Sequence, residues 1–153
     1  QPQEEAQRIA HAGIVTVFDF GHLEDGTAFL IMDLLRGESL RTRMKATGPL
    51  EPRRALHLAE QAASALAAAH AVGVVHRDLK PDNLFLVLDP AAPHGERAKV
   101  LDFGVAKVRL SKDPADQDGA VPTESGALLG TPSYMAPEQC RGAGAVDGAA
   151  DVY

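Results

Sequence analysis

Residues 76–83 read His-Arg-Asp-Leu-Lys-Pro-Asp-Asn, and this stretch decides how the rest of the chain is interpreted. Two further motifs follow it in order. Asp102-Phe103-Gly104 begins 19 residues after Asn83, and Ala136-Pro137-Glu138 comes after a polar segment. Each motif alone is weak, because short motifs recur by chance. The three in this order, each at a strand end or in a loop, form a strong combined signal of one shared site.

The residues upstream of this stretch predict an antiparallel strand pair. Ile14–Phe20 is β-branched and aromatic with partial alternation, and Ala28–Leu35 is a second apolar run. Glu24-Asp25-Gly26-Thr27 lies between them, and Asp-Gly is a strong signal for a hairpin turn. We therefore expect the chain to start with a tail of helix and to continue as this hairpin.

Two helices are predicted between the hairpin and the central motif. Gly37-Glu38-Ser39-Leu40 is expected to break the second strand, and a short helix follows to about Lys45. Pro52 opens the longest helix, where its missing N–H costs nothing, and Gly73 closes it. Apolar residues recur inside this helix at the spacing of one face, so that face is expected to pack on the core. They are Ala55, Leu58, Ala59, Ala62, Leu66 and Ala69.

Short strands and loops are predicted after the central motif. Leu84–Leu88 and Lys99–Leu101 are the strands, and Asp89–Arg97, with two prolines and a glycine, is the surface loop between them. Leu110–Ser125 is polar and long, which is typical of a functional or disordered loop. Because strands and helices do not alternate as βαβ units, the predicted fold class is α+β.

The composition limits the class of protein. The chain of 153 residues is 45% hydrophobic and carries a net charge of −6, so it lacks the basic character of a nucleic-acid binder. A single cysteine, Cys140, rules out an internal disulfide and fits a reducing compartment. No apolar run reaches the ~20 residues that cross a bilayer. We expect a cytoplasmic protein with no membrane segment in this chain, although a longer parent could carry an anchor.

The motifs in order resemble those of the eukaryotic-like protein serine/threonine kinases of bacteria, and the resemblance covers almost the whole chain. It implies a protein-kinase-like fold that is incomplete. Residues 1–35 would be the C-terminal part of the small β lobe, with the end of helix C, a hairpin and the hinge. Residues 36–153 would be the N-terminal half of the large helical lobe. The Gly-rich loop and the upstream lysine of the family are absent from this sequence, so we expect the chain alone to be inactive.

The resemblance assigns roles in phosphoryl transfer to five residues. Asp78 would orient the substrate hydroxyl and accept its proton, and Lys80 would neutralise charge on the transferred phosphate. Asn83 and Asp102 would hold Mg²⁺ through oxygen ligands, which hard cations prefer. Thr131 would hydrogen-bond Asp78 and Lys80. A lysine at position 80 is the form typical of Ser/Thr kinases.

The resemblance also predicts an ATP pocket. Met32 would be the gatekeeper, Asp33 and Leu35 would belong to the hinge that reads adenine, Ser39 would contact the ribose, and Phe85 would floor the pocket. For Met32, Leu35 and Phe85, plain core packing is the alternative interpretation. The complete predicted nucleotide-binding set is Met32, Asp33, Leu35, Ser39, Lys80, Asn83, Phe85 and Asp102.

Three residues are predicted to be regulatory. Arg77 precedes the catalytic Asp, and kinases with this arginine often respond to a phosphorylated activation loop, since Arg pairs well with phosphate. Thr123 and Ser125 lie seven and five residues before Gly130, a spacing that matches the phosphorylated pair of related bacterial kinases. The alternative is a pair of solvated hydroxyls.

Two further residues are predicted to have structural roles. His76 is expected to pack in the core and to hydrogen-bond the backbone. Asp151, in Asp-Val-Tyr, resembles the family's Asp that braces the catalytic loop.

The predicted function is transfer of the ATP γ-phosphate to Ser or Thr hydroxyls of protein substrates, with Mg²⁺. One alternative is a pseudokinase or inactive fragment that acts as a binding module, which the missing upstream lysine leaves open. Another is a small-molecule kinase, which Lys80-Pro81 and Ala136-Pro137-Glu138 disfavour. The resemblance also allows dimerisation of the full-length protein for trans-autophosphorylation.

Overall fold

The computed structural model describes residues 9–103, 132–140 and 146–153. The regular strands are β1 (Val17–His22), β2 (Ala28–Met32), β3 (Gly37–Ser39), β4 (Leu84–Leu88) and β5 (Glu96–Val100). The α-helices are α2 (Leu40–Thr47), α3 (Pro52–His70) and the short α5 (Pro137–Cys140). Short 3-10 turns are η1 (Pro81–Asn83), η2 (Pro93–Gly95), η4 (Pro132–Tyr134) and η5 (Gly148–Asp151). The expected helical tail before Ile9 lies outside the described residues.

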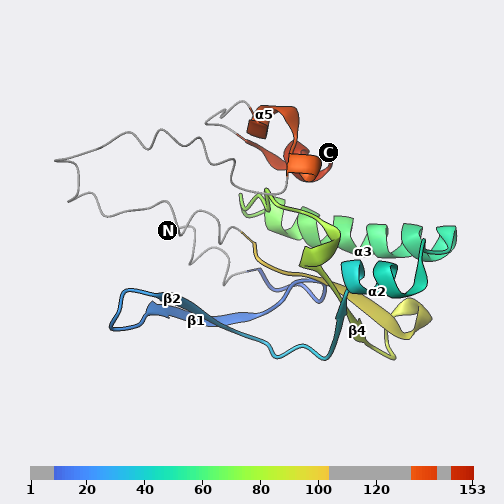
Figure 1. Cartoon of the computed structure of the whole chain (residues 1–153), viewed down its shortest axis with the longest axis horizontal. Helices are drawn as coiled ribbons and strands as arrows, with labels where there is room; N and C mark the ends of the chain where they lie inside the picture. The colour runs from blue at the N-terminus through green and yellow to red at the C-terminus, as the bar shows by residue number, and fades with distance from the viewer. Residues whose placement is uncertain (1–8, 104–131, 141–145) are drawn as a thin grey trace.

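The first two strands form the predicted antiparallel hairpin, which projects away from the rest of the molecule (Figure 1). Its turn follows the Asp-Gly signal, since Gly26 has φ 82° and the N–H of Thr27 donates to Asp25 Oδ1 (2.8 Å). β1 begins three residues later than expected, because Ile14 pairs instead with Val100 as an isolated parallel bridge. The hairpin is therefore confirmed, with a later start.

A second, three-stranded sheet has the order β3-β4-β5, all antiparallel. β4 has its predicted bounds, but the prediction that residues 37–40 only break a strand was wrong, because Gly37–Ser39 pairs with β4. A Cβ on Gly37 would lie 1.9 Å from the carbonyl oxygen of Leu86, so a glycine is required there. The predicted loop at 89–97 was also too long, since β5 already begins at Glu96.

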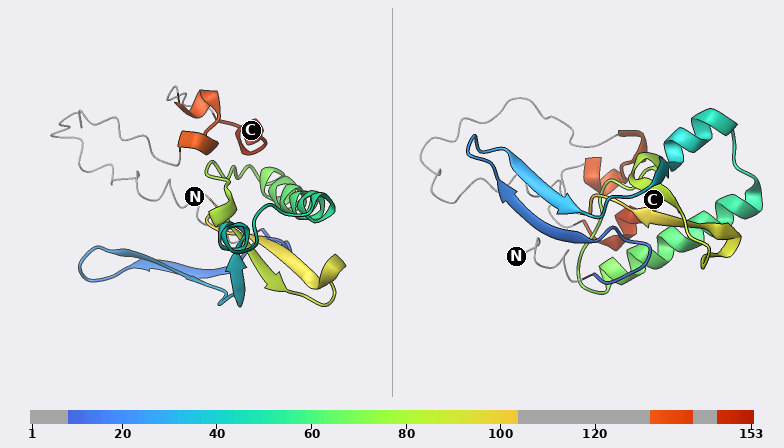
Figure 2. Two further views of the ribbon diagram at one scale, coloured as in Figure 1. Left: turned by 45° about the vertical axis from the view of Figure 1, so that its right-hand side comes forward. Right: turned by 90° about the horizontal axis from the view of Figure 1, so that it is seen from below.

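The core lies between α3 and this sheet, which run side by side in both views of Figure 2. α3 begins as predicted at Pro52, and the Glu51 carboxylate accepts the N–H of Arg54 (3.0 Å) to cap it. The partly buried Leu84 packs against two buried clusters, and each fully buried Leu within them contributes about 1.5–3 kcal/mol. The first cluster is Ile14, Ala65, Leu66, Ala69, Val74, Val100 and Phe103, and the second is Leu40, Leu58, Leu86 and Ala98.

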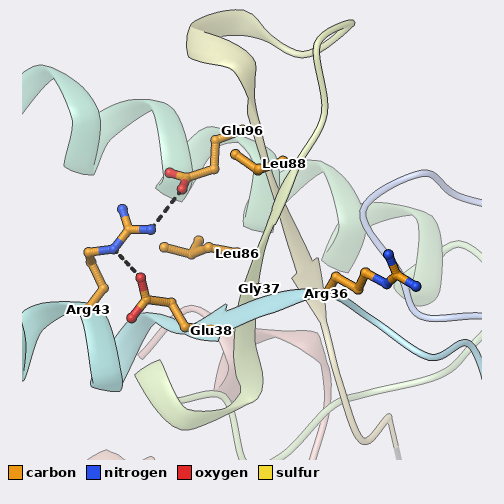
Figure 3. Close-up of a pocket in the computed structure, with 7 residues that line it drawn as sticks. All are labelled: Arg36, Gly37, Glu38, Arg43, Leu86, Leu88 and Glu96. Carbon is orange, nitrogen blue, oxygen red and sulfur yellow. Dashed lines mark hydrogen bonds and ion pairs between the residues drawn. The ribbon is translucent and has the colours of Figure 1, made fainter.

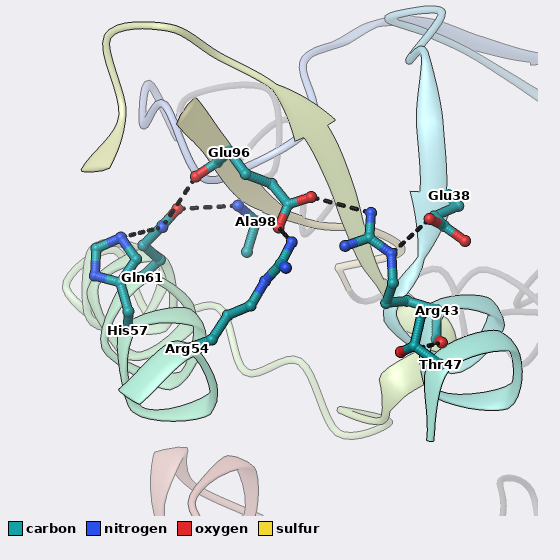
Figure 4. Close-up of polar contacts among 8 residues, drawn as sticks. All are labelled: Glu38, Arg43, Thr47, Arg54, His57, Gln61, Glu96 and Ala98. Atoms are coloured by element: carbon teal, nitrogen blue, oxygen red, sulfur yellow. Dashed lines mark hydrogen bonds and ion pairs between the residues drawn. The ribbon is translucent and has the colours of Figure 1, made fainter. Parts of the chain in front are cut away.

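A polar network ties α2 and α3 to the edge of the sheet (Figure 4). The Glu96 carboxylate lies between the guanidinium groups of Arg43 (3.1 Å) and Arg54 (2.5 Å), and Arg43 also contacts Glu38 (2.6 Å). Burial by itself would raise the pKa of Glu96, but the hydrogen bonds from Arg54 and Arg43 together lower it. We call Glu38, Arg43, Arg54 and Glu96 the Glu96 network.

Residues 146–153 lie on the side of α3 that faces away from the sheet (Figures 1 and 2). They meet the C-terminal end of α3, where Nε2 of His70 contacts Asp151 Oδ2 (2.7 Å). Among the residues that the structure describes, no helix has the length and apolar character that crossing a membrane requires.

Candidate active site

The open end of the β4-β5 hairpin brings two of the predicted site residues to one place. Asn83 directly precedes β4, Asp102 comes two residues after β5, and Leu84 pairs with Val100 between them. The N–H of Leu101 donates to the carbonyl oxygen of Asn83 (2.9 Å), which extends the pairing past the strand ends. The antiparallel register therefore sets two residues that are far apart in sequence at the same edge of the sheet.

Residues 76–83, which we call the catalytic loop, bring three predicted residues into direct contact. Nζ of Lys80 lies 2.6 Å from Asp78 Oδ2. The side-chain Nδ2 of Asn83 donates to the backbone carbonyl of Asp78 (2.8 Å) and lies 3.3 Å from its Oδ2. The Asp78 carboxylate is therefore held by an ammonium and an amide while remaining partly exposed to solvent.

These contacts leave suitable oxygen atoms for Mg²⁺. The amide nitrogen of Asn83 donates to Asp78, so its amide oxygen is the atom that can bind a metal ion. Asp102, two residues after β5, adds an exposed carboxylate at the same edge of the sheet. Within the described ranges, no three His, Cys, Asp or Glu side chains form a metal cage. One carboxylate and one amide fit Mg²⁺, which keeps waters and substrate phosphates as its other ligands.

The backbone of the catalytic loop adopts a conformation that needs support. Arg77 has φ 70°, and such a value costs a non-glycine residue about 1–3 kcal/mol. The N–H of Arg77 donates to Asp151 Oδ1 (2.7 Å), and the N–H of His76 donates to Asp151 Oδ2 (2.8 Å). Asp151 thus braces the loop, as the sequence predicted.

His76 is the most deeply buried polar residue of the loop, with 1% of its surface exposed. Its Nε2 lies 2.7 Å from the carbonyl oxygen of Leu101, and its Nδ1 accepts the N–H of Asp78 (3.2 Å). These partners require a neutral ring protonated on Nε2. Burial lowers the pKa of His76, which favours that neutral form. The predicted core role of His76 is therefore confirmed.

Gln139 in α5 also reaches the catalytic loop, and its side-chain Nε2 donates to the carbonyl oxygen of Arg77 (2.7 Å). This residue was not predicted from the sequence. It directly follows Ala136-Pro137-Glu138, but no motif or periodicity marks a contact with residues 62 positions earlier.

Residues 33–36 link the two sheets, and the residues predicted for the adenine and ribose sites lie on this link or in the strands beside it. Met32 ends β2 and is exposed, and the N–H of Asp33 donates to the carbonyl of Thr16 (3.0 Å). The Ser39 hydroxyl caps α2 by accepting the N–H of Thr42 (3.1 Å). The sequence analysis did not predict this capping contact.

Phe85 and Leu35 are half-buried. Phe85 pairs with Ser39 across β3 and β4. Its neighbours Leu84 and Leu86 pack in the core beneath α3, so strand alternation turns Phe85 to the opposite face of the sheet. This orientation does not fit plain packing in that core.

Three predicted residues lie outside the described residues, namely Thr131, Thr123 and Ser125. Arg77, the remaining predicted regulatory residue, is half-buried within the catalytic loop.

The hollow of about 410 Å³ drawn in Figure 3 lies away from the catalytic loop, at the start of β3 and along β4. It is lined by Arg36, Gly37, Glu38, Arg43, Leu86, Leu88 and Glu96, and it includes none of the predicted site residues.

The family model described as the protein kinase domain matches residues 3–153. The chain belongs to the protein kinase family. This confirms both the resemblance drawn from the motifs and the α+β, kinase-like fold class. Among curated relatives, this kinase chain is 40% identical over 148 residues to serine/threonine-protein kinase pkn3 of Myxococcus xanthus. It is 42% identical over 147 residues to serine/threonine-protein kinase PknA of Mycobacterium tuberculosis.

A solved kinase structure agrees with these relatives. The crystal structure of the Mycobacterium tuberculosis PknI kinase domain matches with a TM-score of 0.65 and 29% identity, covering 97% of this chain and 48% of that one. The alignments with pkn3 and PknA cover 97% and 94% of this chain. The chain spans 26% of the length of pkn3 and 31% of the length of PknA. It therefore corresponds to part of a kinase domain in each relative.

Proposed function

We propose that the protein containing this chain is a serine/threonine kinase that transfers the γ-phosphate of ATP to Ser or Thr hydroxyls of proteins. The observation that carries this proposal is the contact of Lys80 and Asn83 with the Asp78 carboxylate, at 2.6 Å and 3.3 Å. Phosphoryl transfer depends on positioning and on charge stabilisation, and this cluster supplies both.

Each residue of the cluster has a distinct role in the proposal. Asp78 orients the acceptor hydroxyl and takes its proton, and its exposed edge leaves room for that hydroxyl. Lys80 is a compact charge that would stabilise the transferred phosphate. Asn83 and Asp102 would hold Mg²⁺, and bound Mg²⁺ neutralises phosphate charge. Thr131 would join Asp78 and Lys80 as a hydrogen-bond partner.

The nucleotide is proposed to lie along the link between the two sheets. Met32, Asp33 and Leu35 would line the adenine site, with Phe85 on the sheet face opposite the core. Ser39, at the start of α2, would contact the ribose. The chain is proposed to divide at this link, into residues 1–35 with the β1-β2 sheet and residues 36–153 with the β3-β4-β5 sheet.

Regulation and partners are part of the same proposal. Arg77 would pair with a phosphate on Thr123 or Ser125, because guanidinium groups bind phosphate well. The substrates would be proteins with Ser or Thr acceptors in the cytoplasm. A second copy of the full-length protein would be the partner for trans-autophosphorylation.

The test is phosphate transfer from labelled ATP by the full-length protein with Mg²⁺, comparing the natural protein with Asp78→Asn. We expect kcat to fall by about a thousandfold or more, because the substitution removes the proton acceptor but keeps the side-chain shape. Asp89→Asn is the matched control, since Asp89 pairs with Arg97 at the far end of the β4-β5 hairpin.

The outcomes separate the rival functions. No label transfer by either protein would refute the enzymatic role and leave a binding module. Equal label transfer by both would refute the role of Asp78 as the proton acceptor. Label on small alcohols or amines, with none on Ser or Thr of proteins, would point to a small-molecule kinase.

A further inference from the structure

Gln139 uses both ends of its side-chain amide between two segments that are far apart in the sequence. Its Oε1 accepts the N–H of Ala136 (3.0 Å), and its Nε2 donates to the carbonyl oxygen of Arg77 (2.7 Å). The reverse orientation of the amide would set N–H against N–H and oxygen against oxygen, so these partners define its orientation. The amide therefore joins residues 132–140 to the catalytic loop in one way.

The group that Gln139 holds is the peptide bond that leads into Asp78. The carbonyl of this peptide belongs to Arg77 and accepts from Gln139, while its N–H belongs to Asp78 and donates to Nδ1 of His76 (3.2 Å). A peptide plane that is bonded on both edges cannot rotate without losing one of the bonds. Its rotation would change the ψ of Arg77 and the φ of Asp78, and with them the direction in which the Asp78 side chain points.

Arg77 depends on such contacts more than an ordinary loop residue does. Its φ of 70° lies in the left-handed region, which side chains other than glycine seldom adopt. Both of its backbone polar groups are bonded to side chains from later in the chain. The N–H donates to Asp151, 74 residues on, and the carbonyl accepts from Gln139, 62 residues on.

We propose that Gln139 is a positioning residue that orients the Arg77–Asp78 peptide and, through it, the carboxylate that accepts the proton. The inference rests on the proposed kinase function and adds a residue to its machinery. Gln139 also bonds Ala136, which is fully buried, so movement of residues 132–140 would be transmitted to Asp78. The role requires an amide, because one end must accept and the other must donate.

The kinetic test compares Gln139→Leu and Gln139→Glu with the natural full-length protein. We expect kcat to fall about 10- to 100-fold in both, with the KM for ATP changed by less than about twofold, because the nucleotide contacts remain. Gln61→Leu is the matched control. The Gln61 amide also accepts a backbone N–H, that of Ala98 (2.9 Å), but between α3 and β5. This control is expected to lower stability and to leave kcat within about twofold.

The pH dependence distinguishes positioning from simple loss of stability. In Gln139→Glu, one carboxylate oxygen keeps the N–H of Ala136 as a donor, while the other faces the Arg77 carbonyl oxygen with no proton to donate, and this second contact raises the pKa of the new side chain. Once protonated, it regains one O–H donor. The activity of Gln139→Glu relative to the natural protein is therefore expected to rise about tenfold from pH 8 to pH 6. The relative activity of Gln139→Leu is expected to stay flat.

Amide hydrogen exchange at Asp78 gives a readout that does not depend on activity. Loss of the Gln139 contact is expected to speed this exchange at least about tenfold, because the peptide can then rotate away from His76. If the natural protein transfers no phosphate, the proposed function fails, and the exchange rate still decides whether Gln139 fixes this peptide. Natural kcat and unchanged exchange in Gln139→Leu would overturn the inference. If that variant does not fold, a flat pH profile for Gln139→Glu would overturn it.

Discussion

The molecule contains two polar networks, and they differ in whether side chains bond to other side chains or to the backbone. In the Glu96 network, side chains bond mainly to other side chains, and the residues belong to regular strands and helices. In the catalytic loop, Asp151 and Gln139 bond to the backbone of residues 76 and 77, which belong to no helix or strand. A regular element satisfies its own backbone groups, whereas an irregular loop needs side chains from elsewhere to do so.

The two networks are expected to contribute to different properties, one to activity and the other to stability. Support for the catalytic loop holds the left-handed backbone of Arg77 beside Asp78, so its loss is expected to lower activity directly. The Glu96 network joins α2, α3 and the sheet, so its loss is expected to lower stability first. Substitutions in the full-length protein test this difference between activity and stability.

Among substitutions in side chains that support these two regions, the largest loss of stability is expected from Asp151→Ala. The carboxylate is fully buried and accepts the N–H groups of His76 and Arg77, so its removal leaves both unsatisfied. We expect the free energy of unfolding, measured with urea, to fall by about 3–5 kcal/mol and kcat to fall about a hundredfold. Asp147→Ala is the control and is expected to cost about 1 kcal/mol, since it removes a cap bond to Ala149. Equal losses from both would contradict the bracing role.

Lys80→Met is expected to separate activity from stability. Loss of the ammonium that contacts Asp78 removes charge stabilisation, and we expect kcat to fall about a hundredfold, or about 2.7 kcal/mol of transition-state stabilisation. The free energy of unfolding is expected to change by less than about 1 kcal/mol. Lys45→Met, at the end of α2, serves as the exposed-lysine control. A natural kcat in Lys80→Met would remove Lys80 from the proposed site.

Glu96→Gln is expected to show the opposite pattern. The substitution leaves Arg43 and Arg54 without their shared carboxylate, and we expect the free energy of unfolding to fall by about 2 kcal/mol. At a temperature where the variant is folded, kcat is expected to stay within about twofold of the natural value. A selective loss of kcat in the folded variant would show that this network also supports catalysis.

The smallest effect concerns pH and His76. Burial lowers the pKa of His76 below its ordinary 6.5, so the unfolded chain binds a proton there before the folded chain does. Its contribution to stability is therefore complete above pH 6.5 and is lost as the pH falls, by up to about 1.4 kcal/mol per pH unit. Urea unfolding at a series of pH values checks this, with His76→Gln as the reference. Identical slopes for both proteins would show that His76 does not titrate in this way.

The sequence predicted the elements whose signals are local. The strand Leu84–Leu88 and the start of α3 at Pro52 are right because apolar patterning and a helix-start proline mark them. β3 was missed because a strand of three residues exists only through its pairing with β4. Glu96 was placed in a loop because the stretch Asp89–Arg97 contains two prolines and a glycine. Its burial depends on two arginines far away in the sequence.

The candidate site shows the same limit. The motifs located Asp78, Lys80 and Asn83, and the structure brings these three together. Gln139 was missed because its contact with Arg77 depends on where residues 132–140 pack, and no spacing in the sequence encodes that position. Asp151, which also bonds the backbone of this loop, was predicted only through the family resemblance of Asp-Val-Tyr.

The β4-β5 hairpin allows the interval between Asn83 and Asp102 to change in length. The register at Leu84 and Val100 fixes the end of the hairpin that carries Asn83 and Asp102. The far end is a turn closed by Asp89 and Gly95, whose backbone groups bond to each other (3.0 Å). Residues inserted at that turn would lengthen the interval between Asn83 and Asp102 without moving either one. The count of residues between the two motifs is therefore free to drift, while their separation in space is not.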